Sequence, residues 1–330
     1  MSENETSDEL FVQPPRENPL PPVSPVIRAV DPERDLPAIA HIHGQAHPGD
    51  PGGSAFLRHR IVDADPAERR LDVVADVDGE VLGYAFTHLD VEADLPGATI
   101  AQVMVARPHQ SRGIGRALIT RLGEHWNGMG SAVVVGHITI HDSMLFAMRQ
   151  RFAPSSLQLV SRCDLSRPLN TFDVPAGIVL RNLSDDKTFR GMYEVNAQVQ
   201  NDVHPDDTSY TASSFETWHK TTTADPLLDR DTTVVAFDND RPVALSWISR
   251  SETRAWSVLT GVIPEFRGRG LGRLVKSESL RRAQNNGVTE VFATNSDRNT
   301  PILDINKQLG YELYVKQFTV GRILAEPQEG

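Results

Sequence analysis

Residues 103–118 read VMVARPHQSRGIGRAL and residues 260–275 read TGVIPEFRGRGLGRLV, and these two stretches decide the fold. Each begins with an apolar run, passes through a glycine-rich loop and continues with apolar residues at helical spacing. Glycines let the backbone turn sharply, so that successive N–H groups can point at an anion beside a helix N-terminus. The pattern predicts a strand, an anion-binding turn and an amphipathic helix, twice in one chain.

The two stretches belong to an internal repeat that runs through the chain. Residues 27–51 have their counterpart in residues 180–207, and a predicted β-hairpin at 71–86 has its counterpart at 232–247. His47 aligns with His204, and the separation of 157 positions (204 minus 47) is also that between the two loops (267 minus 110). A match that recurs in the same order predicts two copies of one α/β fold, each a mixed, mostly antiparallel sheet flanked by helices.

Composition sets the expected boundaries. Residues 1–25 are rich in proline, acidic and polar groups, which predicts a disordered tail. We expect a first domain at residues 26–165 (the first half), a linker with sparse apolar content at 166–176, and a second domain at 177–326 (the second half).

Length, charge and cysteine count exclude several classes of protein. A chain of 330 residues with 39% hydrophobic and 23% charged residues fits about two globular domains at roughly 100–200 residues each. No apolar run reaches the ~20 residues of a membrane span, and the acidic N-terminus is unlike a secretory signal, so we expect a cytoplasmic protein without membrane partners. The lone Cys163 excludes an intrachain disulfide and is expected to be a buried apolar residue; no metal site is expected. A net charge of -11 disfavours nucleic-acid binding and favours cationic small molecules.

The glycine loops match neither the Walker A pattern nor the G-x-G-x-x-G dinucleotide fingerprint. The simplest alternative is a glycine turn that only joins a strand to a helix. Cations around both loops favour phosphate binding instead, although solvated helix arginines would look the same. These cations are Arg112, Arg116, Arg267, Arg269 and Arg273.

Both loops resemble the acyl-CoA loop, Q/R-x-x-G-x-G/A, of the GCN5-related N-acetyltransferase (GNAT) family, and the layout is similar to its tandem, mycothiol-synthase-type members. The resemblance implies that acetyl-CoA extends its pantetheine arm along the strand before each loop, at residues 102–105 and 259–262. The strand residues so implied are Val103, Val105, Leu259, Thr260 and Val262. The loop residues implied to hold the pyrophosphate are Gln110, Ser111, Arg112, Gly113, Ile114, Gly115 and Arg116, then Arg267, Gly268, Arg269, Gly270, Leu271, Gly272 and Arg273.

The second half carries a further family segment, ATNSDRNTPILDINKQLGYEL, at residues 293–313. The resemblance implies that Asn295 and Asn299 bind pantetheine. The tyrosine that often protonates the departing thiolate would fall at Asn306, which has no titratable proton, so another donor or water must serve. The corresponding stretch of the first half, residues 137–152, lacks the asparagine pair, so we expect the second half to be catalytic and the first to be degenerate. The sequence leaves open whether the first half also catalyses.

Acid and base candidates concentrate in the loop after the first helix of the second half. His204, Asp206 and Asp207 there are candidates to bind or deprotonate an amine, although His-Pro-Asp-Asp also suits an ordinary turn. Thr260 is a candidate to position a water, and Trp218 and Trp247 are candidates to line the acceptor pocket, although each also suits a structural place. We expect structural roles for His137 and His141.

The resulting hypothesis is an acyl-CoA-dependent N-acetyltransferase that acetylates a primary amine of a small cationic metabolite by direct attack in a ternary complex. Acylation of a cysteinyl or peptide amine is the alternative within enzymes. A catalytically inactive acyl-CoA sensor or scaffold is the alternative from another class. The sequence does not indicate an oligomeric state.

Overall fold

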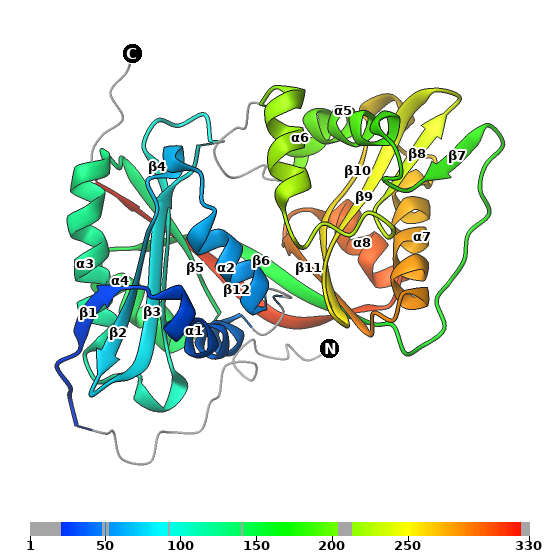
Figure 1. The fold of residues 1–330 in the computed structure, drawn as a ribbon. Coiled ribbons are helices and arrows are strands. Elements are labelled where there is room, and N and C mark those ends of the chain that lie inside the picture. Colours follow the sequence, from blue (N-terminus) through cyan, green and yellow to red (C-terminus); the bar gives the residue numbers. More distant parts are fainter. Residues whose placement is uncertain are drawn as a thin grey trace, which may run out of the picture.

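The structure, a computed structural model, describes residues 21–47, 50, 53–91, 93–139, 141–203 and 213–324. Within these residues the strands join into a single 12-stranded sheet, in the order β1-β2-β3-β4-β5-β12-β6-β11-β10-β9-β8-β7 (Figure 1). The two sheets expected from the repeat are therefore continuous with each other.

Each half follows the same order of elements. The first half comprises β1 (Val26–Ala29), α1 (Pro32–Ala46), α2 (Ser54–Val62), β2 (Leu71–Val77), β3 (Glu80–Leu89), β4 (Ala98–Val105), α3 (Ile114–Met129), β5 (Val133–Ile138), α4 (His141–Arg149) and β6 (Ala153–Asp164). The second half comprises β7 (Ile178–Arg181), α5 (Asp186–Val203), α6 (Phe215–Ala224), β8 (Val234–Asp238), β9 (Arg241–Ser251), β10 (Arg254–Val262), α7 (Leu271–Asn285), β11 (Glu290–Ser296), α8 (Thr300–Gln308) and β12 (Tyr311–Ile323).

The halves exchange their last strands. β6, at the end of the first half, pairs with β11 of the second half, and β12, at the end of the chain, pairs with β5 of the first half. β12 also pairs with β6 along most of its length, and Figure 1 shows it crossing between the halves. The stretch expected as the linker lies between β6 and β7, so a cut there would leave each half with a strand that belongs to the other half's sheet.

In the first half, helices cover both faces of the sheet. Ile114, Leu118 and Leu122 of α3 are buried on one face against alternate residues of β2 and β3. Leu36, Ile39 and Ile42 of α1 are buried on the other face, where α2 joins them. The apolar residues of both helices recur at three- and four-residue spacing, which gives each helix one apolar stripe.

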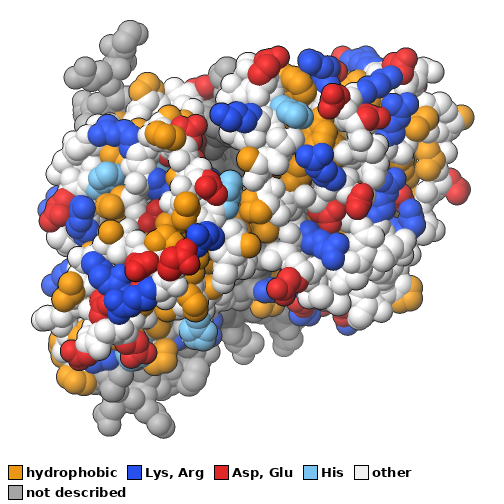
Figure 2. All heavy atoms as spheres, in the orientation of Figure 1, with side chains coloured by type: hydrophobic (Ala, Val, Ile, Leu, Met, Phe, Trp, Pro, Cys, Tyr) orange, Lys and Arg blue, Asp and Glu red, His pale blue; other side chains and the backbone are white. Residues whose placement is uncertain are grey.

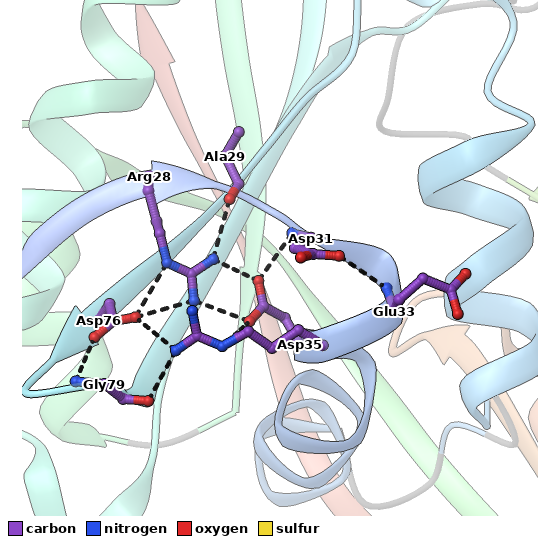
Figure 3. Close-up of polar contacts among 8 residues, drawn as sticks. Arg28, Ala29, Asp31, Glu33, Asp35, Asp76 and Gly79 are labelled. Carbon is purple, nitrogen blue, oxygen red and sulfur yellow. Dashed lines mark hydrogen bonds and ion pairs between the residues drawn. The ribbon is translucent and has the colours of Figure 1, made fainter.

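A partly buried ion-pair network fixes the position of α1. The Arg28 guanidinium on β1 donates to both Asp35 carboxylate oxygens, at 2.6 and 2.9 Å, and to Asp76 at the end of β2 (Figure 3). The Asp35 side chain is fully buried, and its hydrogen bonds from Arg28 lower the pKa of its carboxyl group. Asp31 caps the helix by accepting from the Glu33 N–H. The network therefore ties the start of α1 to two strands.

Residues 21–25 correct the expected limit of the disordered tail. The Val23 N–H donates to the Arg112 carbonyl at 3.0 Å, and Arg112 Nε donates to the Pro21 carbonyl at 2.8 Å. Two hydrogen bonds thus hold this short segment against the first glycine loop.

Lys276 of the second half and Cys163 of the first half are buried titratable groups without an ion-pair partner in the described chain. Lys276 of α7 is 1% exposed, its ammonium lies 4.7 Å from the centre of the Tyr311 ring, and burial lowers its pKa to about 7. Cys163 of β6 is buried as expected, and burial raises the pKa of its thiol to about 11, which makes it a poor nucleophile at neutral pH.

Candidate functional site

The two glycine loops have the same backbone geometry. In the first, Ser111 and Gly113 have φ values of 63° and 95°; in the second, Gly268 and Gly270 have φ values of 74° and 77°. Gly113 and Gly270 stand at the N-caps of α3 and α7, so left-handed backbone turns the chain into each helix. These positions require glycine because a Cβ disfavours the left-handed region.

A matching side-chain hydrogen bond braces each loop. Gln110 Nε2 donates to the Val105 carbonyl, and Arg267 Nε donates to the Val262 carbonyl, both at 3.1 Å. Each bond ties the start of a loop to the last carbonyl of the strand before it. The Q/R position of the motif therefore has a structural role in both halves.

Each loop presents backbone N–H groups at the start of a long helix. The first turn of a helix leaves N–H groups without intrahelical partners and carries partial positive charge, a combination that binds phosphate. Gly113, Gly268 and Gly270 are exposed to solvent. Both loops can therefore receive a pyrophosphate.

The five arginines expected around the loops have different surroundings. Arg112 faces Pro21 and His109, Arg269 lies over the Phe266 ring at 4.5 Å, and Arg273 lies over the Phe172 ring at 4.3 Å. Arg116 is exposed and lines a cavity beside the first loop. On the face shown in Figure 2, basic and acidic side chains are interspersed.

The strands before the loops diverge from their parallel neighbours. β4 pairs with β5 only from Ala98 to Ile100, and β10 pairs with β11 only from Arg254 to Trp256. The residues expected to contact pantetheine follow these paired stretches. They are Val103 and Val105 on β4, and Leu259, Thr260 and Val262 on β10. A split of this kind leaves backbone groups on β4 and β10 free to pair with an extended ligand.

A cavity of about 430 Å³ occupies the split in the first half. It runs from Gly113, Gly115 and Arg116 of the loop past Val103 to His137 of β5. At its far end the Gln102 side chain spans the strands: in the orientation that satisfies both groups, its amide donates to the His137 carbonyl at 3.1 Å and accepts from the His137 N–H at 3.0 Å. The first half thus keeps an open cleft.

The second half has buried polar atoms on β10, β11 and α8. Thr260 Oγ1, Thr294 Oγ1 and Asn306 Oδ1 are buried, and none has a hydrogen-bond partner among the described residues. Asn306 Nδ2 donates to Asn295 Oδ1 at 2.8 Å, which joins α8 to β11. Buried polar atoms are costly unless a ligand or water pairs with them, so each of these atoms is a candidate partner for a bound ligand or a water. The sequence motif located Asn295 and Asn306, whereas no signal pointed to Thr294.

Other residues singled out from the sequence have structural surroundings. Asn299 stands at the N-cap of α8. Trp218 is 7% exposed within the core, and the Trp247 ring packs edge-on against it at 6.3 Å. Trp247 Nε1 is buried and unpaired within the described chain. His204, Asp206 and Asp207 lie outside the described residues.

The first-half counterpart of His204 lies in a cluster of imidazoles. His47 caps the C-terminus of α1, and its ring centre is 5.1 Å from that of His43. His43 Nε2 lies 3.6 Å from the Asp50 carboxylate. The repeat pointed to this loop, but the sequence gave no indication that His43 and Asp50 join it. No group of His, Cys, Asp or Glu in the described ranges has the geometry of a metal site.

The described helices include none that is long and apolar enough to cross a membrane.

Comparisons with known proteins give one family. A model of the acetyltransferase (GNAT) family matches residues 36–141 and 192–311, once in each half. A mycothiol acetyltransferase of Thermomonospora curvata is 27% identical over 250 residues, covering 75% of this chain and 81% of the relative. One of Geodermatophilus obscurus is 25% identical over 261 residues, covering 76% and 82%.

Two solved structures are similar in fold. A GCN5-related N-acetyltransferase from Sphaerobacter thermophilus has a TM-score of 0.72 at 21% identity, covering 92% of this chain and 97% of that one. A tandem GNAT protein from the clavulanic acid biosynthesis pathway, solved without AcCoA, also has a TM-score of 0.72, at 19% identity, covering 91% and 98%.

Proposed function

The chain belongs to the acetyltransferase (GNAT) family and is an N-acetyltransferase with two such domains in tandem, and from this premise we propose that its acyl donor is acetyl-CoA and its acceptor a primary amine of a small molecule. The observation that carries the proposal is the repeated pair of braced glycine loops, each beside a split between two parallel strands.

The residues around both splits fit acetyl-CoA. Loop N–H groups at Gly113 and Gly270 would hold the pyrophosphate, and β4 and β10 would pair with the amides of pantetheine. Thr260, Thr294 and Asn306 would supply hydrogen-bonding partners in the second half. When bound, acetyl-CoA supplies an acyl group activated as a thioester.

We place the main reaction in the second half, by direct attack in a ternary complex. Amide formation requires a neutral amine, so a group near the acceptor must take its proton. His204, Asp206 and Asp207 are the proposed groups, and the cluster around His47 supports this assignment because His47 occupies the matching position in the repeat. Asn306 cannot donate a titratable proton, so we assign it to binding or to the orientation of a water.

The acceptor proposed is a small cationic metabolite, because the chain carries a net charge of -11. A cysteinyl or peptide amine is the second candidate, supported by relatives named as mycothiol acetyltransferases. The inactive-sensor hypothesis has no such support, since these relatives are named as enzymes.

Two measurements test the proposal. Mass spectrometry of products from acetyl-CoA and an amine library that includes cysteinyl amines should show one or more acetylated amines, with release of free thiol in equal amount. Binding of acetyl-CoA without thiol release, over the whole library, would contradict transfer and support the sensor.

A further inference from the structure

A second cavity, of about 230 Å³, lies between the two halves. Phe86 of β3 contributes an apolar wall from the first half. Val160, Trp256 and Val315 of β6, β10 and β12 contribute apolar walls from the strands on the other side. The exchange of strands therefore builds this cavity, because β12 lies directly beside β5 in the sheet and β6 follows on the other side of β12.

The second cavity meets the cofactor cleft of the first half. His47, Gln102, His137 and Thr139 line both. β4 runs from its paired residues at Ala98–Ile100 toward the glycine loop, so a pantetheine arm that starts at the loop extends back toward Gln102. The acyl end of the donor would therefore arrive where the two cavities join.

The walls at this junction carry imidazoles that are neutral at neutral pH. Burial, and then the nearby His43 and His137 rings, lower the pKa of His47 to about 3. Burial also lowers the pKa of His43, while the Asp50 carboxylate opposes that shift. A neutral imidazole has a free lone pair, so it can accept a hydrogen bond from an amine, and its low pKa means that it does not hold the amine's proton at neutral pH.

We propose that the first half is a second acyl-transfer centre, in which a small amine with an apolar group enters the inter-half cavity and His47 accepts a hydrogen bond from its neutral nitrogen. The inference rests on the proposed use of acetyl-CoA, and it assigns chemistry to the half whose motif looks degenerate. A C–N bond forms between the amine nitrogen and the acyl carbon, and the C–S bond breaks with its electron pair on sulfur. The proton that the nitrogen loses passes to the departing thiolate or to water, so charge and atoms balance.

The dimensions and charges of the cavity define the acceptor. Its volume is below the roughly 300–1,000 Å³ of sites for drug-sized ligands, so it admits a small molecule. Asp50, on the wall beside His43, would attract the ammonium form of an amine. Phe86 and Trp256 would contact an alkyl or aryl group on that amine. We therefore expect arylalkyl or short alkyl amines to be preferred over hydrophilic polyamines.

The experiment separates the two halves before it tests His47. Gly270→Val disables the second loop, and thiol release by this variant is measured with acetyl-CoA and phenethylamine, alongside calorimetric titration with acetyl-CoA. We expect one molecule of acetyl-CoA bound and measurable turnover. His47→Ala in the same background should slow turnover at saturating amine by about 10-fold, as expected for the loss of one hydrogen bond to the reacting nitrogen, with acetyl-CoA binding retained.

Two further variants guard against loss of folding. His125→Ala removes an imidazole that lines neither cavity and that donates a hydrogen bond to the Arg69 carbonyl. This variant should leave turnover unchanged. Val315→Phe fills the cavity from β12 without touching an imidazole, and should raise the Michaelis constant for phenethylamine.

The possible failures are distinguishable. If the unaltered protein neither binds acetyl-CoA nor releases thiol with any amine, the proposed function fails. If the unaltered protein acetylates amines, but the Gly270→Val variant binds one acetyl-CoA and turns over none of them, only the second centre is overturned. Equal turnover by the His47→Ala and His125→Ala variants would show that His47 takes no part in the second centre.

Discussion

Replacing Gly113 or Gly270 by alanine separates the strain of the loop from its role in binding. Both glycines have left-handed backbone, and a Cβ built at either meets no atom closer than 3.7 Å. The cost is therefore conformational rather than steric, about 1–2 kcal/mol for an L-residue in that region.

That cost must appear either in the unfolding free energy or in the affinity for acetyl-CoA. If the loop keeps its shape, the variant loses about 1–2 kcal/mol of unfolding free energy and its affinity for acetyl-CoA stays the same. If the free loop relaxes, stability is retained and binding must restore the strained shape, which weakens affinity by about 5- to 30-fold. Either way, the loss in stability plus the loss in binding free energy should equal about 1–2 kcal/mol at each loop.

Urea unfolding and calorimetric titration with acetyl-CoA measure both quantities. Gly79→Ala is the matched control: it also has positive φ and nothing within 4 Å of the new Cβ, but it lies in the turn between β2 and β3. We expect Gly79→Ala to lower the unfolding free energy and to leave the affinity for acetyl-CoA unchanged. If Gly113→Ala and Gly270→Ala match the control in stability and bind acetyl-CoA as the unaltered protein does, loop relaxation is excluded. If the loss in stability plus the loss in binding free energy is far larger than the strain, the Cβ itself excludes the pyrophosphate, and the strain argument is refuted.

Three further predictions concern buried polar groups. Asp35→Asn should lower the unfolding free energy by about 3 kcal/mol at pH 7, because Arg28 loses a buried partner. Since the folded pKa of Asp35 is depressed, this contribution to stability is present above about pH 4 and shrinks as pH falls through the folded pKa. Urea titrations of both proteins at several pH values would reveal this dependence. Lys276 has a folded pKa of about 7, below that of an unfolded lysine, so the unfolded chain binds more protons between pH 7 and about 10, and stability should rise there by about 1.4 kcal/mol per pH unit. Lys276→Met should abolish the rise, and an unchanged slope would contradict the burial of a titrating amine. Asn306→Ala should slow turnover by well under ~100-fold while costing about 1–3 kcal/mol of stability, because Asn295 loses its partner; a larger drop in the rate at saturating substrate would assign Asn306 a direct part in the reaction.

Local patterns predicted the repeat, the glycine loops and the helices after them, because periodic apolar residues and a left-handed glycine turn are properties of a few consecutive residues. The short strands β1 and β7 were not predicted as strands, since four residues are too few to show alternation. The helices α2 and α6 were also not expected. They add to α1 and α5 on one face of each half, and neither belongs to a recognised motif.

The candidate site was predictable only in part for a related reason. Gln110, Arg267 and the loop glycines could be assigned from spacing because each contacts backbone within a few residues of itself. His43, Asp50 and Trp256 reach the inter-half cavity through tertiary packing, which no spacing rule encodes. The exchange of β6 and β12 likewise depends on pairing between strands that are far apart in the sequence, which local patterns do not specify.

That exchange also orders the events of synthesis. The ribosome completes β5 and β6 early, yet β5 pairs with Phe318–Ile323 of β12, and β6 pairs with β11 and β12, all of which emerge last. Until then the apolar β5 strand, VVVGHI, has an open edge, the feature that recruits other chains into aggregates. A nascent chain that stalls before Tyr311 cannot close the sheet of its first half, so a chaperone bound to the β5 edge during translation would protect the whole protein.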